Sequence, residues 1–302
     1  MIVVIYRKVF FAITGALVVL SLAAVIFYGL NFGTDFTGGT LVEMRYDGAR
    51  PTTEEVSSAL TAAQFSGFSL REAGDSSLIL RAGTITPEMR AGLPQVLSLN
   101  GKYHGTIARL TEVGPIIGVE LRNKAFVALG VVLLAIMLYV AFAFRHVSKP
   151  VSSWIYGAIA LITLVHDVVV PTGFFALLGH FFGAQVDTLF VTAILTILGF
   201  SVHDTIVVFD RVRENLALNA DAHKREDFEL TAGRSLNQTF VRSVNTSLTV
   251  LISLGVLFYI GPVATEDFAL TLIVGIIAGT YSSIALATPL LVAAEKWRSP
   301  AK

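Results

Sequence analysis

Six long apolar stretches alternate with polar segments along the chain. They cover residues 9–30, 125–144, 154–178, 188–209, about 239–260 and about 268–292. Each stretch holds about 20 or more residues, which is the length that an α-helix needs to cross the hydrocarbon core of a bilayer. The pattern therefore predicts six membrane-spanning helices. The first has an apolar core longer than that of a signal peptide, and Leu22-Ala23-Ala24 is a poor cleavage site, so we expect it to stay uncleaved.

A different pattern marks residues 31–123. Alternation of apolar and polar positions predicts four strands, at about 40–46, 68–72, 77–82 and 105–113. A helix fits between the first two strands, with Thr52 or Thr53 as N-cap and Glu55 placed for a capping box. A second helix, with Pro87 as its first residue, fits before the last strand. The order βαββαβ is that of a ferredoxin-like, split βαβ domain.

The predicted fold is thus an all-α membrane bundle of six helices with an external α+β domain. Residues 1–30 form an N-terminal region with the first span, residues 31–123 form the ferredoxin-like domain, and residues 124–302 hold the other five spans. The charged segment 210–238 lies between spans four and five. It predicts a short amphipathic helix at the membrane surface, a loop at about 219–226 and a lead-in to span five.

Lysine and arginine are unevenly distributed over the short loops. They occur after spans two, four and six, at Arg145, Lys149, Arg211, Arg213, Lys224, Arg225, Arg234, Lys296, Arg298 and Lys302. The loops 179–187 and 261–267 have neither residue. Because short basic loops stay on the cytoplasmic side, we expect both termini to be cytoplasmic and the ferredoxin-like domain to be outside.

Composition supports a membrane protein and excludes several kinds of function. Hydrophobic residues make up 54% of the chain and charged residues 15%, whereas soluble domains have about 25% charged residues. The net charge is zero and there are no cysteines, so we expect no nucleic-acid partner, disulfide or thiolate metal site. The HExxH, GxSxG and Walker motifs are absent from the sequence. The chain is therefore not expected to be an enzyme or to need a cofactor.

Ionisable residues inside the predicted spans are the candidate functional site, because their burial costs several kcal/mol. Span three carries His166 and Asp167, span four carries His203 and Asp204, and span five carries Arg242. Asp204 and Arg242 fall in the cytoplasmic halves of adjacent spans, so they are expected at a similar depth. A cation that approaches or leaves Asp204 would change its proton affinity and so load or release a proton.

Other interpretations of these residues are open. Asp204 and Arg242 can form a static pair, or Arg242 can extend to the lipid headgroups. His166 and Asp167 can simply satisfy each other, and His203 is expected to tune Asp204. Neighbouring residues on a helix point about 100° apart, so the two His-Asp pairs are not expected to bind a metal.

Glycines flank the external domain on both sides. Gly38 and Gly39 follow the first span, and Gly114, Pro115 and Gly118 precede the second. Such residues permit tight turns, and their place at both junctions also fits a hinge.

Five segments together resemble the SecF family, the smaller half of the SecDF protein-export component and a relative of the RND transporters. They are NFGTDFTGGT at 31–40, VGPIIGVELRNKA at 113–125, LVHDVVV at 164–170, GFSVHDTIVVFDRVREN at 199–215 and LNQTFVRSVNTS at 236–247. The resemblance implies an RND-type half that pairs with SecD, associates with SecYEG and uses the proton-motive force to assist preprotein export. It implies a place in the bacterial cytoplasmic (inner) membrane, among membrane lipids.

The same resemblance maps the family's functional carboxylate onto Asp204 and its functional arginine onto Arg242. The family commonly has Asn where this chain has His203, so the pH response is expected to differ. Two other functions compete. An RND-type exporter of small molecules or lipids would need larger external domains, and an intramembrane hydrolase would need a nucleophile motif that the sequence lacks.

Overall fold

The computed structural model describes residues 2–145 and 151–298 of the chain, which form two compact units. The helical unit comprises Met1–Leu30, Val127–Phe182 and Leu189–Lys302, and the sheet unit comprises Asn31–Phe126 and Gly183–Thr188. Lys149 and Lys302, two of the residues behind the predicted orientation, lie outside the described residues.

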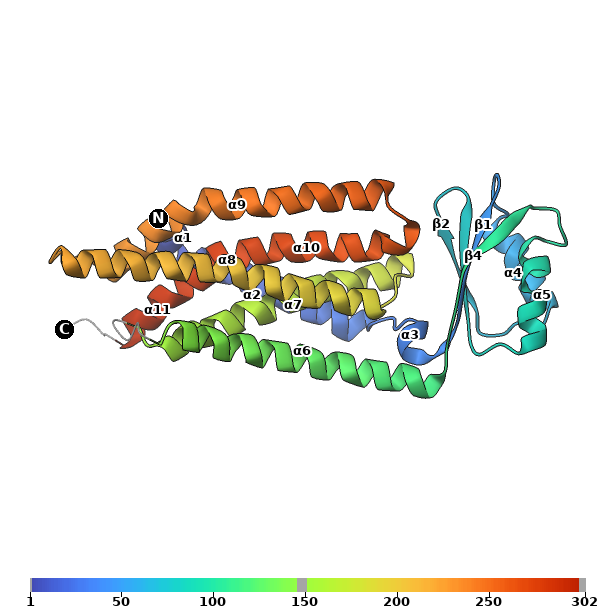
Figure 1. Ribbon diagram of the computed structural model, residues 1–302, viewed down its shortest axis with the longest axis horizontal. Coiled ribbons are helices and arrows are strands. Elements are labelled where there is room, and N and C mark those ends of the chain that lie inside the picture. Colours follow the sequence, from blue (N-terminus) through green and yellow to red (C-terminus); the bar gives the residue numbers. More distant parts are fainter. Residues whose placement is uncertain (1, 146–150, 299–302) are drawn as a thin grey trace. The chain divides into compact units, whose positions relative to one another are not determined.

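Long helices build the helical unit (Figure 1). In chain order the helical segments are α1 (Ile2–Ile5), α2 (Arg7–Tyr28), α6 (Pro115–Ala143, whose first residues belong to the sheet unit), α7 (Ser153–Phe182), α8 (Thr188–Asp221), α9 (Phe228–Ile260), the 3-10 turn η1 (Val263–Thr265), α10 (Glu266–Ser282), the π-helix η2 (Ser283–Ala287) and α11 (Thr288–Arg298). Among the described residues, six helical segments are long and apolar enough to cross a membrane, the last running from Val263 to Arg298. The predicted six-helix pattern is confirmed.

Small residues let these helices approach closely. A Cβ atom on Gly173 of α7 would lie 2.4 Å from Cα of Ser21 of α2, and one on Gly275 of α10 would lie 2.1 Å from Cδ1 of Ile197 of α8. Close contact between backbones is the usual way in which helices associate in lipid, where no hydrophobic force drives them together. The GxxxG pair Gly275 and Gly279 therefore serves packing.

The sheet unit has the predicted order of elements. It contains α3 (Thr34–Thr37), β1 (Gly39–Tyr46), α4 (Thr53–Ala62), β2 (Ser69–Ala73), β3 (Ser77–Ala82), α5 (Pro87–Leu97) and β4 (Gly105–Val113). The strands form an antiparallel sheet in the order β2-β3-β1-β4, as expected for a split βαβ fold. Alternate strand residues pack on the two helices in one core, built from Val42, Met44, Val56, Leu60, Leu78, Leu80, Leu93 and Leu97.

The helix starts in this unit follow the sequence signals. Thr52 caps α4 and forms a full capping box with Glu55, which satisfies two of the free N–H groups at the helix start. Thr86 caps α5 by accepting a hydrogen bond from Met89 N, and Pro87 is the first residue of that helix.

One predicted element, the surface helix, is wrong, whereas the predicted loop at about 219–226 nearly coincides with the turn between Asp221 and Phe228. Residues 210–238 do not form a separate surface helix, because α8 continues to Asp221 and α9 already begins at Phe228. Polar side chains join the two extensions: Asn215 Nδ2 donates to Ser235 Oγ at 2.8 Å, and Asn219 Nδ2 donates to Thr231 Oγ1 at 3.2 Å. The extensions therefore form a helical hairpin instead of lying separately on a membrane surface.

Candidate functional site

Two aspartates are buried within the helical unit, one on α7 and one on α8. The exposed fraction is 0% for Asp167 and 3% for Asp204. Both lie on helical segments that are apolar enough to span a membrane. A carboxylate buried there needs hydrogen-bond donors, a counter-charge or a proton, and the two residues meet this need differently.

Asp167 is fully satisfied. Its Oδ1 lies 2.8 Å from His166 Nδ1, and its Oδ2 accepts a hydrogen bond of 2.9 Å from Ser282 Oγ. Ser201 Oγ donates to the same Oδ2 atom. The carboxyl group thus joins α7 to α8 and α10. His166 and Asp167 contact each other, which agrees with the interpretation that each satisfies the hydrogen-bonding needs of the other.

His166 extends this cluster toward α2. Its ring centroid lies 6.2 Å from that of Tyr281, and the Tyr281 hydroxyl lies 3.3 Å from Thr14 Oγ1. The Nε2 atom of His166 is buried and makes no hydrogen bond with the described residues. We name the set Asp167, His166, Ser201 and Ser282 the Asp167 cluster.

Asp204 has fewer partners. Its Oδ2 atom is buried and has no hydrogen-bond partner among the described residues, and the same holds for the hydroxyl of Ser243 on α9. Ser243, His203 and Arg242 are nevertheless close enough to act on the Asp204 carboxyl group. The buried oxygen needs a proton, or a donor from outside the described chain, to be stable.

The predicted partner of Asp204 is not in direct contact with it. No ion pair joins Asp204 to Arg242 in the described part of the chain, and the side chains of Arg242 and His203 are exposed. The reason is helical geometry, because successive residues point about 100° apart. Ser243 takes the inward position next to Asp204, which places Arg242 on the surface of α9. Arg242 therefore acts on Asp204 only at longer range.

A polar run at the end of α10 lies between the two aspartates. Thr280 Oγ1 lies 2.5 Å from Ser247 Oγ of α9, Ser282 bonds Asp167, and Ser283 Oγ lies 3.2 Å from Thr205 Oγ1 of α8. The π-helix η2 begins at Ser283, and π-helical turns occur frequently at functional sites. The run thus touches α7, α8 and α9 within one helical turn.

Sequence reasoning singled out both aspartates, but not the run on α10. Thr280, Tyr281, Ser282 and Ser283 follow one another inside a long apolar segment. Four consecutive polar residues in an apolar span are unusual, and this pattern could have marked them as candidate site residues. Such hydroxyls usually bond a backbone carbonyl of the previous turn, as Thr280 does with Ile276 O, so the signal is weak without a structure.

The junction glycines are packed together within the sheet unit. A Cβ atom on Gly38 would lie 2.6 Å from Cα of Pro115, and one on Gly118 would lie 2.8 Å from Gly38 N. Gly38 and Gly39 also have positive φ angles, of 79° and 131°, which favour glycine. Gly114 has open space around it. The structure therefore gives Gly38 and Gly118 a role in close backbone packing.

A neighbouring contact fixes the start of α8. Asp35 Oδ2 accepts hydrogen bonds from Thr188 N at 3.1 Å and from Thr188 Oγ1 at 2.6 Å. Phe32 and Val186 form a short parallel β-bridge beside it. The segment after the first span thus supplies an acceptor to a helix start far along the chain, and this satisfies the backbone N–H group of Thr188.

Among the described residues, no group of three or more His, Cys, Asp or Glu side chains could hold a metal ion. The buried polar residues of the helical unit supply several hydroxyl groups and the carboxyl groups of Asp167 and Asp204. Groups of both kinds can hold and pass protons.

Comparison with protein families gives two matches. The family described as "Protein export membrane protein SecD/SecF, C-terminal" matches residues 96–297, and the "SecD/SecF GG Motif" matches residues 23–49. The second match contains Gly38 and Gly39. Together the two matches cover most of the chain.

Individual relatives agree with these matches. The protein translocase subunit SecF of Thermobaculum terrenum is 40% identical, over 96% of this chain and 92% of that protein. The protein of the same name from Anaerolinea thermophila is 36% identical, over 97% of this chain and 94% of that protein.

Solved structures of SecDF are similar as well. The crystal structure of SecDF, a translocon-associated membrane protein, from Thermus thermophilus has a TM-score of 0.83 at 32% identity and covers 97% of this chain. SecDF in a super-membrane-facing form has a TM-score of 0.66 at 33% identity and covers 95%. The chain spans 38% of the length of each of these SecDF chains.

Proposed function

The chain belongs to the SecD/SecF family of protein-export membrane proteins, and on this premise we propose that it is a SecF-type subunit of the Sec protein-translocation machinery. In this role it is not an enzyme. It assists the export of preproteins across the cytoplasmic membrane and uses the proton-motive force to do so. The names of its relatives and its similarity to SecDF over nearly its whole length support the proposal.

The subunit acts with partners. A SecD-type protein supplies the part of SecDF that this chain does not span, and the SecYEG channel delivers the preprotein. Both termini lie in the cytoplasm of a bacterial cell whose inner membrane holds the six helices, and the sheet unit lies outside. The uneven distribution of Lys and Arg supports this orientation.

One observation carries the proton-coupled part of the proposal, namely the buried carboxyl oxygen of Asp204 that has no hydrogen-bond partner among the described residues. In the neutral form the carboxyl group is tolerated in a span, whereas the charged form needs a partner. Exchange between the two forms changes what Asp204 requires from its surroundings. A proton crossing the membrane through this site can therefore favour one arrangement of the helices over another.

His203 and Arg242 complete the site from the surface of the chain. Both side chains are exposed in this chain alone, so a SecD-type partner or lipid faces them. Approach of Arg242 to Asp204 stabilises the carboxylate and releases its proton, and withdrawal restores the neutral form. Arginine stays charged throughout, so its role is electrostatic and Asp204 carries the proton.

The Asp167 cluster has a different part in this proposal. Both oxygens of Asp167 already have donors, so a change in its protonation would break existing hydrogen bonds. We assign it to holding α7, α8 and α10 in register, with His166 as its nearest neighbour in any proton relay. Ser283 is hydrogen-bonded to Thr205, which follows Asp204 in the chain. Through this bond the end of α10, which carries Ser282 of the Asp167 cluster, is connected to the part of α8 that carries Asp204.

Replacement of the proton carrier tests the proposal. Asp204→Asn keeps the size of the side chain but cannot exchange a proton, whereas Asp210→Asn changes an exposed residue of the same helix that pairs with Arg213. In membrane vesicles that lack the native subunit, we expect Asp210→Asn to support preprotein export driven by the proton-motive force and Asp204→Asn to abolish it. Export at the wild-type level with Asp204→Asn would refute the proton-coupled role.

A further inference from the structure

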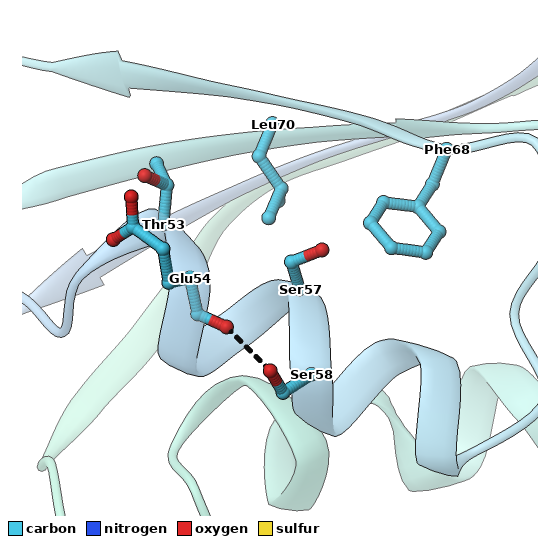
Figure 2. A pocket seen from close by; sticks show the side chains of 6 residues that line it. All are labelled: Thr53, Glu54, Ser57, Ser58, Phe68 and Leu70. Atoms are coloured by element: carbon cyan, nitrogen blue, oxygen red, sulfur yellow. Dashed lines mark hydrogen bonds between the residues drawn. The ribbon is translucent and has the colours of Figure 1, made fainter.

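The sheet unit has an edge that faces a groove. Within the described chain, β2 pairs with β3 on one side only and forms one end of the sheet. Beside it lies a groove of about 470 Å³ between β2 and α4 (Figure 2). It is lined by Thr53, Glu54, Ser57, Ser58, Phe68 and Leu70.

The groove combines an apolar wall with a hydroxyl-bearing wall. Phe68 and Leu70 project from the strand side toward α4, where Ser57 faces them (Figure 2). Both apolar side chains are only partly buried and pack on the core of the unit. An apolar side chain from outside would therefore find apolar contacts on one wall and small residues on the other.

One carboxylate, that of Glu54, lines the groove. Glu55 is neutralised by Lys102 at 2.9 Å, and Glu72 by Arg50 at 2.8 Å. Glu54 lies at the groove, is exposed, and makes no ion pair with the described residues. Its carboxylate is therefore available to a basic group on a ligand.

An edge strand beside a side-chain pocket is the arrangement used when an extended peptide adds to a sheet. Alternate residues of the edge strand offer main-chain N–H and C=O groups outward. These groups give affinity for any extended chain, and the neighbouring pocket selects side chains.

We propose that β2 and this groove form a docking site for an extended polypeptide segment with an apolar residue close to a basic one. The main chain of the segment pairs with the outer edge of β2, and its apolar side chain enters the groove between Phe68 and Ser57. Its basic side chain faces Glu54. That the occupant is a preprotein in transit rests on the proposed function, whereas the binding itself does not.

Peptide binding to the purified full-length chain in lipid nanodiscs tests the site. The probe is a fluorescent peptide of alternating leucine and threonine with one lysine, and its control has proline at alternate positions. Ser57→Trp fills the groove and should weaken binding of the probe by about tenfold or more. Ala62→Trp, on an exposed position of the same helix, should leave binding unchanged. Equal binding by wild type and Ser57→Trp, or equal binding of the proline peptide, would overturn the proposal.

The charge at the rim has its own control. Glu54→Lys should weaken binding of the lysine probe by about threefold at low salt, and this difference should shrink as salt is added. The same peptide with glutamine in place of lysine should bind both proteins alike. A loss of affinity for both peptides would show that the charge has no part in recognition. Thermal unfolding of each variant separates these effects from misfolding.

Site-specific cross-linking identifies the occupant, because the chain has no cysteines of its own. Ser57→Cys and Ala62→Cys are placed in membranes with a stalled preprotein that carries a single cysteine. We expect a disulfide to the preprotein from Ser57→Cys and none from Ala62→Cys. Cross-linking of Ser57→Cys to the SecD-type subunit alone would overturn the preprotein as occupant. We expect the Asp204→Asn protein to bind the peptide as the wild type does. Failure of the proton-coupled role and failure of the peptide site can then be told apart.

Discussion

Asp167 and Asp204 have the same side chain and similar burial, but different surroundings. His166, Ser201 and Ser282 hold both oxygens of Asp167, whereas one oxygen of Asp204 has no partner among the described residues. A hydrogen-bonded group stabilises the fold and resists change. A group left without partners costs stability and is retained where it has a function.

This contrast predicts different effects of the same substitution. Asp167→Asn places an amide N–H₂ group where a donor now points, so it should lower the free energy of unfolding by about 1–3 kcal/mol. Asp204→Asn should change stability much less, because Oδ2 of Asp204 has no hydrogen-bond partner to lose among the described residues. Thermal unfolding in lipid nanodiscs measures both variants. Equal losses for the two would contradict the assignment of roles.

Tyr46 should make the stability of the sheet unit depend on pH. Its burial raises the pKa of the phenol from 10.0 to about 12, and its hydroxyl donates to Leu97 O at 2.9 Å. A raised pKa in the folded state contributes stability that is complete below pH 10 and is lost as the pH rises toward 12. Unfolding of the sheet unit, followed by circular dichroism, should show this loss. Tyr46→Phe should lack this pH-dependent step, and a wild-type curve that stays flat through the interval would contradict it.

The residues behind the site were only partly predictable. An aspartate in an apolar stretch stands out in a sequence, so Asp167 and Asp204 could be found. Ser282 could not be assigned, because a serine in a span commonly bonds its own helix. Its contact with Asp167 depends on how α10 packs against α7, and the sequence does not display this tertiary arrangement.

Helix α10 is the element that joins the site. Its Gly279 lies against Ser201 of α8, where an added Cβ atom would be 3.0 Å from the serine Cβ. Directly after Gly279 the polar run from Thr280 to Ser283 contacts three other helices, and the π-helix η2 begins at Ser283. A π-helix leaves the regular hydrogen-bond ladder of a helix, so the backbone here is a suitable place for a small rearrangement.

Close packing of α10 on α8 can be tested with two glycines. Gly275→Ala forces its Cβ atom against Ile197, and overpacking of this kind costs about 1–3 kcal/mol. Gly199→Ala, on α8 with open space around it, should be neutral or slightly stabilising because alanine favours helices. Thermal unfolding compares the two. A stable Gly275→Ala protein with normal export would show that the close approach is dispensable.

Helix existence was predictable along the chain, but the point where α8 ends and the point where α9 begins were not. Apolar length marked every span, and capping signals at Thr52 and Pro87 marked both helices of the sheet unit. The ends of α8 and α9 extend beyond the apolar stretches, because their charged and polar residues pair with each other. Those pairs depend on the tertiary arrangement, so periodicity and hydropathy alone favoured a short helix at the membrane surface over a continuous extension of each span.

For the whole molecule, the proposed orientation makes a direct prediction. Asp75→Cys in the turn between β2 and β3 should react with a membrane-impermeant maleimide on intact cells. Ala222→Cys, in the turn after α8, should react only after the membrane is opened. Both positions are exposed, and the cysteine-free background makes the labelling specific. The reverse pattern would contradict the positive-inside assignment.

The architecture of the whole molecule followed from the sequence more closely than its contacts did. The count of spans and the βαββαβ order depend on local patterns, which the sequence displays. The cap that Asp35 provides to α8, 153 residues away, depends on chain packing and has no local signal. The same is true of Ser243, which takes the buried position next to Asp204 while Arg242 lies exposed on α9.

The central claim is that Asp204 is the carboxyl group that exchanges protons. Infrared spectroscopy of the protein in lipid measures it most directly, because a protonated carboxyl group has its own C=O stretching band. We expect a band that appears and disappears with pH in wild type and in Asp210→Asn, and that is absent from Asp204→Asn. A titrating band that persists in Asp204→Asn and is lost in Asp167→Asn would contradict the account.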